Sequence, residues 1–520
     1  MNSFDECPVD ASAIKAAAVT DDVVQLDVTL QLERDSVASD QVTHLFGMLS
    51  FKAPTPTTAS STAPLDIVVC VDASGSMSGK KIELLQKTLD FVVTQMKPSD
   101  RLAIVKFNGV ASVVAGLTRT DAANGDKLIN AIRTIEASGG TDIAAGVALS
   151  IKLLRNRKEE NPLTSILLLT DGQDAHALPK IEKLWTTAPR GCSLHLFGFG
   201  ADHDATLLAK IAATSAGMFQ YIETFESVGF AFATTLGGLK AICAVDLQVR
   251  VTCVTPGASV VAAHTKYAST LSDDGRVLSV QLPDLFQGES RDLVFSLAVP
   301  RAAEAGSAQE LLTGTVSFMS PFGVPSKNDA APLVLARPAV VAPDAPCNMA
   351  VSAQRNRVRA TEALDTATKL ASESNLAAAR ETLAGAIESI KASASCELPL
   401  CKDLIASLLS AKARLVDSRS YAHGGEAELR GVAHMHAQQR TAAPCRGAPA
   451  LEAPYGYSAA QRECNGNYAS IPSPRSSIPA GVPYNASFAP IRPIPGVPVA
   501  SGYTRIQVAN NSYGCLPSGN

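Results

Sequence analysis

The chain has 520 residues, of which 46% are hydrophobic and 18% charged, and its formal net charge is −4. This length predicts two to four domains, and the apolar content is sufficient for a buried core, so a wholly disordered chain is excluded. The nearly neutral charge gives no whole-chain reason to expect nucleic acid or an anionic membrane as a partner.

The first 22 residues carry little pattern and are expected to form a loose leader. Their beginning, MNSFDECPVDAS, is acidic and lacks the apolar run of a secretory signal. The most apolar long stretch, residues 230–245, is interrupted by Lys240 and falls short of the roughly 20 residues that span a bilayer. The eleven cysteines include no CxxC pair and fit free thiols. We therefore expect a cytoplasmic protein without a transmembrane segment.

Two runs near the amino terminus, residues 23–33 and 44–52, alternate apolar and polar residues with the period of half-buried strands. A Pro/Thr/Ser-rich linker follows them. Further strand runs without intervening helices lie between residues 245 and 318. We predict one antiparallel β-sandwich built from residues 23–63 and 241–337, with the intervening segment inserted between its two pieces.

The inserted segment, residues 64–240, alternates short apolar strand runs with stretches whose apolar residues recur every three or four positions. Strands are expected at 67–71, 102–107, 112–115, 166–169, 194–199 and 219–222. This alternation predicts an α/β fold with a doubly wound, mostly parallel, Rossmann-like sheet. The run Ser112–Ala115 follows Asn108-Gly109, a hairpin signal, and is predicted as an antiparallel edge strand.

The last third of the chain divides into two parts. Residues 345–443 contain long helical runs at 355–391 and 402–419, which predict a helical hairpin or small bundle. Residues 444–520 are rich in proline, glycine, serine and tyrosine, and we expect a disordered tail there.

Three separated loops of the inserted segment carry the informative residues. Asp72-Ala73-Ser74-Gly75-Ser76 follows one strand, Gly139-Gly140-Thr141-Asp142 opens a helix, and Thr170-Asp171-Gly172 ends another strand. In an open parallel sheet such positions converge on one crevice, where ligands bind. We therefore expect these loops to form one site.

Oxygen is the ligand type that this site offers, from two carboxylates and three hydroxyls, without sulfur or imidazole. Hard divalent cations prefer that set, so the expected cofactor is Mg²⁺, with Mn²⁺ or Ca²⁺ as alternatives. Ser74, Ser76 and Thr141 are predicted to bind directly, and Asp72 and Asp171 directly or through water. An open coordination position would remain for a carboxylate from outside.

Asp72-x-Ser74-x-Ser76, Thr141 and Asp171, in this order, resemble the metal-ion-dependent adhesion site of von Willebrand factor type A (VWA) domains. The resemblance covers about residues 65–236. It implies a protein ligand whose Asp or Glu side chain completes the Mg²⁺ shell. Around the ligands, Asp142 is expected to cap its helix or to act behind the metal, and the helix end near Lys80 to favour an anionic ligand.

A narrower resemblance concerns the flanks. LSFKAP, the run LDIVVCVDASGSMSGKKIELLQKTLDFVV and HMHAQQRTA are similar to an intracellular branch that includes plant RING-finger ubiquitin ligases and proteins with an intein-associated helical domain. Because Cys7 alone precedes Cys70, no RING can be built here, and ligase activity is not expected.

Other interpretations remain beside this one. Hydroxyl and Asp residues at strand ends can simply cap helices and turns. Gly75–Gly79 has Met77 at its centre, where a nucleophile elbow needs serine, and no P-loop is present, so no enzyme is expected. The preferred function is a metal-dependent protein-binding scaffold. The alternatives are an accessory component of a ubiquitin ligase pathway and extracellular adhesion. The partner and the oligomeric state are left open.

Overall fold

A computed structural model describes residues 7–19, 24–55, 62–200, 203–215, 217–222, 225–302, 304–342, 345–440 and 458–469. All of them belong to one compact unit, residues 1–471. Most of the tail expected at 444–520 lies outside the described residues.

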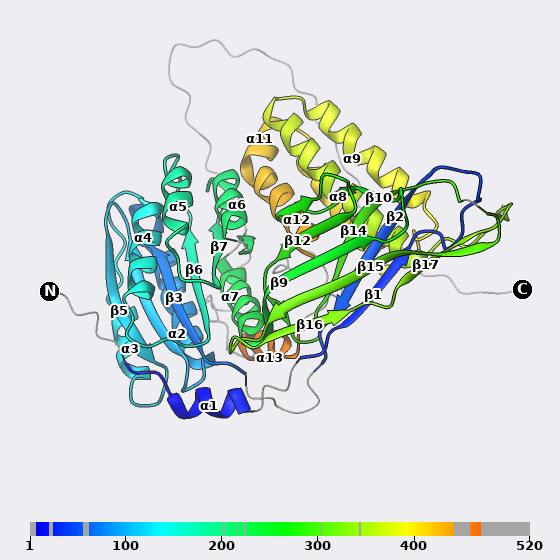
Figure 1. The fold of residues 1–520 in the computed structure, drawn as a ribbon. Coiled ribbons are helices and arrows are strands. Elements are labelled where there is room, and N and C mark those ends of the chain that lie inside the picture. Colours follow the sequence, from blue (N-terminus) through cyan, green and yellow to red (C-terminus); the bar gives the residue numbers. More distant parts are fainter. Residues whose placement is uncertain are drawn as a thin grey trace, which may run out of the picture. The chain divides into compact units, whose positions relative to one another are not determined.

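The α/β part contains a six-stranded sheet (Figure 1). Its strands, in the order β5-β4-β3-β6-β7-β8, are parallel except for β5, which pairs antiparallel with β4. The predicted α/β fold class and the antiparallel edge strand are thereby confirmed. The bounds are β3 (Leu65–Asp72), β4 (Arg101–Phe107), β5 (Ala111–Arg119), β6 (Leu163–Thr170), β7 (Cys192–Phe199) and β8 (Phe219–Ile222).

Helices cover both faces of this sheet, which explains why its strands read as continuous apolar runs. Ile67, Val69 and Val71 of β3 share a core with α2 (Lys80–Gln95), α3 (Gly125–Ile132) and α7 (Phe225–Lys240). Val68 and Cys70 point to the opposite core, with α4 (Ile143–Arg155), α5 (Ala177–Trp185) and α6 (Ala205–Thr214). Alternate residues of one buried strand therefore serve two cores.

Two antiparallel sheets form the β-sandwich. One has the order β1-β2-β14-β10, and β2 pairs with β14 from Thr43↔Val299 to Lys52↔Ser290. Strands from before and after the α/β part thus lie in one sheet. The bounds are β1 (Asp27–Leu32), β2 (Thr43–Lys52), β14 (Ser290–Val299) and β10 (Ser259–Ala263).

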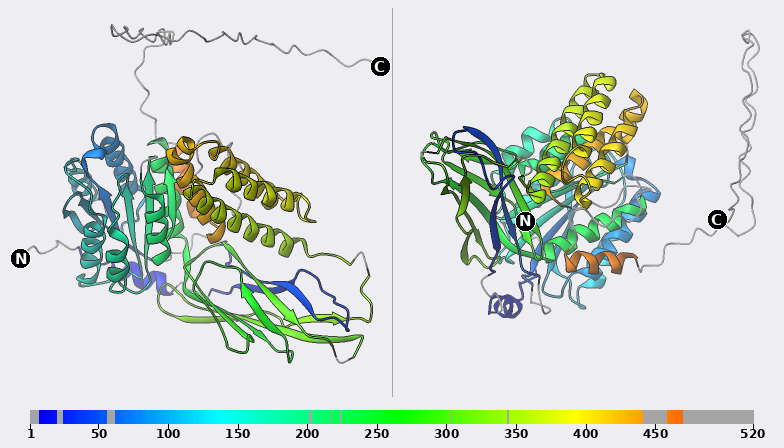
Figure 2. Two further views of the ribbon diagram at one scale, coloured as in Figure 1. Left: turned by 90° about the horizontal axis from the view of Figure 1, so that it is seen from above. Right: turned by 90° about the vertical axis from the view of Figure 1, so that its right-hand side faces the viewer.

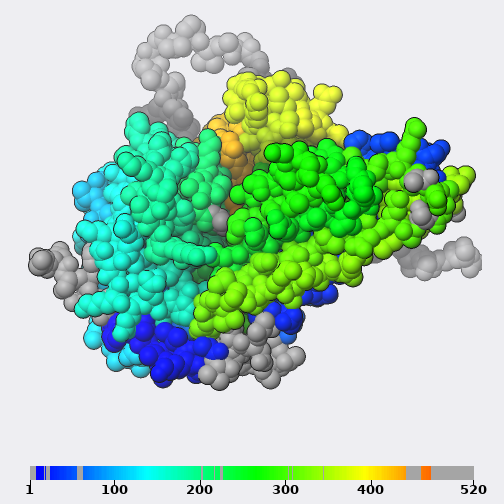
Figure 3. Space-filling model, viewed as in Figure 1, coloured from blue at the N-terminus to red at the C-terminus, as the bar shows by residue number. Residues whose placement is uncertain are grey.

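The second sheet has the order β11-β12-β9-β15-β16, with β13 beside β9 and β17 beside β15. Side chains of both sheets interdigitate: a Cβ added to Gly314 on β15 would lie 2.7 Å from Leu49 Cδ1 on β2. In the space-filling view, these strands (green) form much of the surface on the side shown (Figure 3). The bounds are β9 (Ile242–Cys253), β11 (Ser269–Leu271), β12 (Val277–Leu282), β13 (Leu285–Phe286), β15 (Ser307–Met319), β16 (Pro325–Asp329) and β17 (Leu333–Arg337).

The carboxyl-terminal helices pack around an alanine- and leucine-rich core of their own (Figure 2). The longest, α8, begins at Asn348, whose side chain accepts hydrogen bonds from the amides of Ala350 and Val351. The expected helical region is confirmed, with more helices than a hairpin. The bounds are α8 (Met349–Ser372), α9 (Leu376–Lys391), α10 (Pro399–Arg414), α11 (Ser418–Ser420), the kinked segment η2 (Tyr421–Gly425) and α12 (Glu426–Gln438).

Polar side chains of α12 join it to both neighbouring parts. Its His434 Nε2 accepts a hydrogen bond from the amide of Phe219 in β8 at 3.1 Å. Beyond its end, Gln439 Oε1 accepts from the amide of Asp292 in β14 at 3.0 Å, and Arg440 Nε donates to Glu289 at 2.9 Å. The α/β part and the sandwich therefore share α12 as a common support.

Two terminal segments differ from the expectations. Within the leader, α1 (Ala11–Val19) is helical, and the amide of Cys7 donates to Leu117 O at 2.8 Å. The carbonyl of Cys7 also accepts from Arg101 at 2.9 Å, so the described part of the leader is tied to the α/β part at this residue. Within the expected disordered tail, α13 (Ala459–Ala469) is an ordered helix, stabilised by its packing on α7.

No helix in the described ranges combines the length and the apolar composition that crossing a bilayer requires.

Candidate metal centre

The predicted site residues lie where the strand order of the α/β sheet reverses. The connection after β3 runs toward β4, whereas the connection after the neighbouring β6 runs toward β7, so the two leave in opposite directions and open a crevice beyond the carboxyl ends of β3 and β6. Asp72 is the last residue of β3, and Thr170 is the last of β6. The sheet topology thus brings the first and third predicted loops side by side.

Asp72 is fully buried, and both of its carboxylate oxygens accept hydrogen bonds. Oδ1 accepts from the amide of Ser74 at 2.8 Å, and Oδ2 accepts from the hydroxyl of Thr170 at 2.5 Å. Burial raises the pKa of the Asp72 carboxyl, although the bonds from Ser74 and Thr170 act in the opposite direction. Two fixed bonds hold this carboxylate in one orientation.

A chain of hydroxyls connects the first loop to the third. Ser74 Oγ lies 3.0 Å from Ser76 Oγ, and Ser76 Oγ donates to Asp171 Oδ1 at 2.7 Å. Ser74 and Asp171 are buried, whereas Ser76 is exposed. The cluster therefore has a protected base and an outer side open to solvent.

The second loop reaches the same cluster through backbone contacts. The amide of Gly75 donates to Gly139 O at 3.0 Å. A Cβ added to Gly172 would lie 3.0 Å from Thr141 Oγ1 and 3.3 Å from Asp72 Oδ2, so the Thr141 hydroxyl lies beside Asp72 at the third loop. This close approach requires glycine at position 172. All five predicted ligand residues are thus brought together.

The two flanking residues behave differently. Asp142 caps α4, because its Oδ1 accepts from the amide of Ala145 at 2.9 Å. Lys80 is exposed, and the neighbouring Lys81 instead donates to Asp171 Oδ2. The helix end near Lys80 was expected to favour an anionic ligand, and the lysine that contacts the cluster at this helix end is Lys81.

Two contributors, Lys81 and Thr170, were missed from the sequence. Helical side chains lean toward the amino terminus of their helix, so a lysine in the first turn of α2 reaches back over the preceding loop. Thr170 adjoins Asp171 at the end of a strand, and its hydroxyl binds both Asp72 and, at 3.0 Å, the amide of Gly172. The first-turn position of Lys81 and the strand-end position of Thr170 could both have been recognised in the sequence.

The donor set suits a hard divalent cation. Two carboxylates and three hydroxyls offer oxygen alone, as Mg²⁺ prefers. In the described residues, no group of three or more His, Cys, Asp and Glu side chains is placed to hold a metal. The five residues of the cluster include no cysteine or histidine, so the cluster does not resemble a zinc site built from those ligands.

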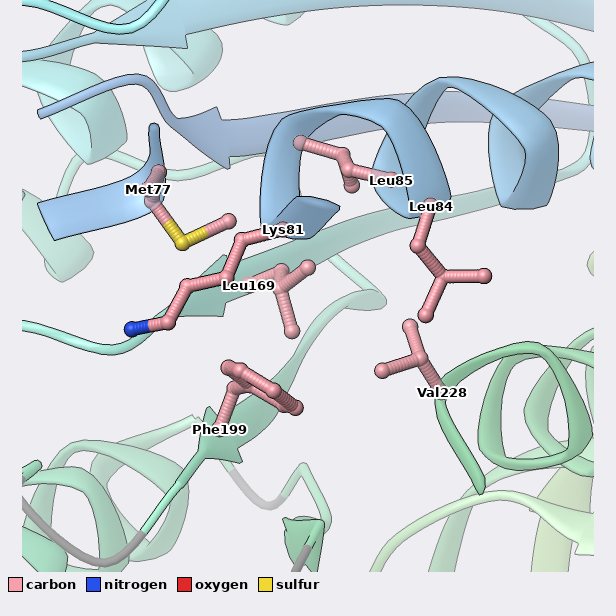
Figure 4. A pocket seen from close by; sticks show the side chains of 7 residues that line it. All are labelled: Met77, Lys81, Leu84, Leu85, Leu169, Phe199 and Val228. Carbon is pink, nitrogen blue, oxygen red and sulfur yellow. The ribbon is translucent and has the colours of Figure 1, made fainter. Parts of the chain in front are cut away.

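A pocket adjoins the cluster through Lys81 (Figure 4). The Lys81 side chain extends along it, and Val228 of α7 faces Leu84 of α2. The pocket is otherwise apolar. Its lining consists of Met77, Lys81, Leu84, Leu85, Leu169, Phe199 and Val228.

Comparisons with known proteins agree with this geometry. Residues 66–234 match the model of the von Willebrand factor type A domain, and residues 348–442 match that of the CPSF6-like RSLD domain, N-terminal region. A solved von Willebrand factor type A structure from Catenulispora acidiphila has 14% sequence identity and a TM-score of 0.61, and the match covers 82% of this chain and all of that one. At this identity the match shows the fold alone.

Two curated relatives extend beyond the matched region. An uncharacterized protein of Synechocystis is 29% identical over 45% of this chain and 57% of its own length. The E3 ubiquitin-protein ligase WAV3 of Arabidopsis thaliana is 29% identical over 49% of this chain and 35% of its own length. The chain thus spans between about a third and somewhat more than half of these relatives. Sequence match and sheet topology together identify residues 66–234 as a von Willebrand factor type A domain.

Proposed function

We propose that the chain is a non-enzymatic scaffold whose VWA domain binds a protein partner through Mg²⁺. One observation carries this proposal: three loops from separate parts of the sequence place oxygen donors together at the switch point of the sheet, on a side open to solvent. Helix capping alone does not require this combination, since Asp142 is the residue that caps α4. VWA domains commonly bind proteins in a metal-dependent way.

Ser74, Ser76 and Thr141 would contact the cation directly, and Asp72 and Asp171 would hold it directly or through water. A bound Mg²⁺ would supply a positive charge with a coordination position for an outside carboxylate. Asp72, Asp171 and Lys81 together carry a formal charge of −1, so a divalent cation leaves the cluster positive. That balance favours a partner that presents Asp or Glu.

Lys81 affects the cation affinity of the same site. Its ammonium pairs with Asp171 Oδ2, and 30% of its side chain is exposed against 3% for Asp171. A partly exposed cation beside a buried carboxylate competes with a metal for that carboxylate. It also remains close enough to attract the carboxylate of an approaching partner.

Proximity labelling tests the proposal, because it identifies partners and their metal dependence together. The full chain would be compared with Ser76→Ala, which removes one donor at an exposed position, and with Asp72→Ala. Asp126→Ala, an exposed acid in the first turn of α3, is the matched control. Partners labelled by wild type and the control, and lost in both site variants and in EDTA, are the expected result. Equal labelling by all four chains would refute the mechanism.

A second candidate is an accessory role in a ubiquitin ligase pathway. Its support is the alignment with WAV3, which extends over 273 residues and so beyond the matched domain. Co-purification of ubiquitinated proteins or of a ligase with the tagged chain would favour this role. Pulldowns free of both would count against it.

We also propose a cytoplasmic location. In the described part of the chain, Cys70, Cys253 and Cys401 lie in the cores as free thiols, as expected in a reducing compartment. Secretion of the tagged full chain would overturn this and favour an adhesive role outside the cell.

A further inference from the structure

Helix α13 lies against the last helix of the VWA domain, α7, although about 220 residues separate them in sequence. It begins with a capping box: Ser458 Oγ accepts from the amide of Gln461 at 3.2 Å, and Gln461 Oε1 accepts from the amide of Ser458 at 2.9 Å. Ser-x-x-Gln is a sequence signal for this helix start. An isolated helix of 11 residues is marginal in water, so α13 depends on its contacts with the domain.

The surface of α7 under α13 is made of small residues. Gly229, Ala233 and Gly237 recur every four positions and so line one face of the helix. A Cβ added to Gly237 would lie 2.5 Å from the Gln461 Cα, and one added to Gly229 would lie 2.0 Å from the Tyr468 ring. Glycine at these positions lets the two helices approach more closely than larger side chains would allow.

Polar contacts fix the register of α13 against α7 and α2, the two helices that together form the groove in which it lies. Thr234 Oγ1 donates to Asn465 Oδ1 at 3.0 Å, and Gln461 Nε2 donates to Thr234 O at 3.2 Å. At the far end, Asn467 Nδ2 donates to Gln95 Oε1 of α2 at 2.8 Å. These bonds involve both helices that form the groove.

Apolar contacts complete the interface. Tyr468 packs edge-on against Phe91 of α2, with ring centroids 5.0 Å apart. Cys464 is 1% exposed and packs with Phe91 and Ala233. Cys464 of α13 is thus buried against α2 and α7, and release of α13 would expose its thiol.

The helix that α13 holds also borders the metal centre. Val228 of α7 lines the pocket that contains Lys81 (Figure 4), and Lys81 contacts Asp171. Val228 and Gly229 are adjacent, so one turn of α7 faces the Lys81 pocket on one side and Tyr468 on the other. A shift of this turn would change the space available to Lys81.

We propose that α13 is a detachable latch on α7, held near its groove by the chain that links it to α12, and that its release alters cation binding at the metal centre. The second half of this statement rests on the proposed function. The linking chain keeps the local concentration of α13 high, so the latch closes by intramolecular binding. A partner helix that offers the same face would have to displace it.

Thiol labelling of the full chain tests the latch directly. Gly237→Ala places a methyl group against the backbone of α13 while raising the helix propensity of α7, so it should release α13 without unfolding the domain. Gly466→Ala is the opposite variant, because a Cβ there meets no atom within 4 Å and strengthens α13 itself. Maleimide modification of each cysteine would be followed by peptide mass spectrometry.

Cys464 should be modified at least tenfold faster in Gly237→Ala than in wild type and about fivefold slower in Gly466→Ala. Cys401, fully buried in the core of the carboxyl-terminal helices, should stay protected in every variant and thereby show that the chain is folded. Equal Cys464 rates in the three chains would overturn the latch. If Cys401 also becomes reactive in Gly237→Ala, Tyr468→Ala provides the same comparison from the α13 side.

Calorimetric titration with MnCl₂ separates the latch from its coupling to the metal centre. A change of threefold or more in the Mn²⁺ dissociation constant between Gly237→Ala and wild type is expected. Faster Cys464 labelling with an unchanged Mn²⁺ constant would overturn the coupling. Absence of Mn²⁺ binding in every chain would instead refute the proposed function, and with it the coupling, while the labelling result still decides the latch.

Discussion

Lys81 and Asp171 form an ion pair at the edge of the candidate metal centre, with the ammonium on Oδ2 and the Ser76 hydroxyl on Oδ1. The pair joins the first turn of α2 to the end of β6. The carboxylate that we assign to cation binding is thus already shared between a hydroxyl and a cation of the protein itself. Any metal that binds there competes with Lys81.

Replacing Lys81 by methionine should strengthen cation binding. The variant removes the competing charge and keeps an unbranched apolar side chain in the pocket. Because partly exposed ion pairs contribute at most about 1 kcal/mol, we expect the Mg²⁺ dissociation constant to fall by about fivefold. Isothermal titration calorimetry measures it.

Lys80→Met is the matched control for this experiment, since Lys80 is the exposed neighbour with the same charge. It should change the constant by less than twofold. Equal effects of the two variants would show that the general electrostatic field, and not the Lys81–Asp171 contact, governs the affinity.

The buried histidine His195 predicts acid sensitivity of the VWA fold. Its Nδ1 accepts from the amide of Met218 at 3.4 Å, and its Nε2 lies 3.1 Å from Ser193 Oγ. The acceptor role of Nδ1 requires a neutral ring. Burial lowers the pKa of His195 to about 3, against about 6.5 in the unfolded chain. Its stabilising effect is therefore complete above pH 6.5 and declines as the pH falls toward 3.

We expect the titration of His195 alone to lower the free energy of unfolding by about 1 kcal/mol per pH unit below 6.5. His434 and His436, whose pKa values burial lowers to about 4 and about 3, act in the same direction. Asp100 and Asp284, whose pKa values burial raises to about 6, act in the opposite direction. Guanidinium unfolding of wild type and His195→Asn at pH 7.5 and pH 5.0 isolates the histidine. The stability gap between the two chains should narrow at pH 5.0, and a constant gap would contradict the assignment.

The ion pair between Arg101 and Asp66 lies at the amino ends of β3 and β4, away from the metal centre, and should contribute strongly to the stability of the VWA domain. Arg101 Nε and Nη2 donate to the two oxygens of Asp66 at 2.8 and 2.7 Å, and both side chains are fully buried. Arg101→Met removes the bidentate partner of Asp66 but leaves Arg157 Nη1 on Asp66 Oδ2 at 3.0 Å, so the cost should lie at the lower end of the range for breaking a buried pair, about 3 kcal/mol. Chemical denaturation measures the loss.

The exposed pair Lys327–Asp329 provides the comparison for Arg101, with side chains 60% and 58% exposed. Lys327→Met should cost less than about 1 kcal/mol. Similar losses for the two substitutions would mean that Arg101 contributes little beyond a surface contact.

Periodicity predicted the α/β sheet, because strands buried on both faces and helices buried on one face leave distinct patterns, and the Asn108-Gly109 hairpin signal predicted its antiparallel edge. Residues 64–76 and 139–172 held enough turn and strand-end signals to bring Asp72, Thr141 and Asp171 to one edge. Lys81 was missed as a member of the site because its contact with Asp171 depends on the direction of its side chain, which points back over the loop before α2.

Helix α13 was missed for a different reason. Its composition is polar, and its stability comes from a groove formed by residues around 91 and 229–237, far away in the sequence. Composition can indicate which segments cannot build a core of their own, but it cannot indicate which of them dock on the core of another. The capping box at Ser458 was the local signal.

The proposed function depends on cation binding by the three loops, which titration of MgCl₂ into the full chain measures. Wild type should bind one Mg²⁺, and Ser76→Ala should weaken that binding at least tenfold, because it removes a direct donor that also orients Asp171. Ser78→Ala, two residues further on and hydrogen-bonded to Gly75 O, should leave it unchanged. Mg²⁺ binding of equal strength in wild type and Ser76→Ala, or no binding in wild type, would show that the three loops do not form a cation site.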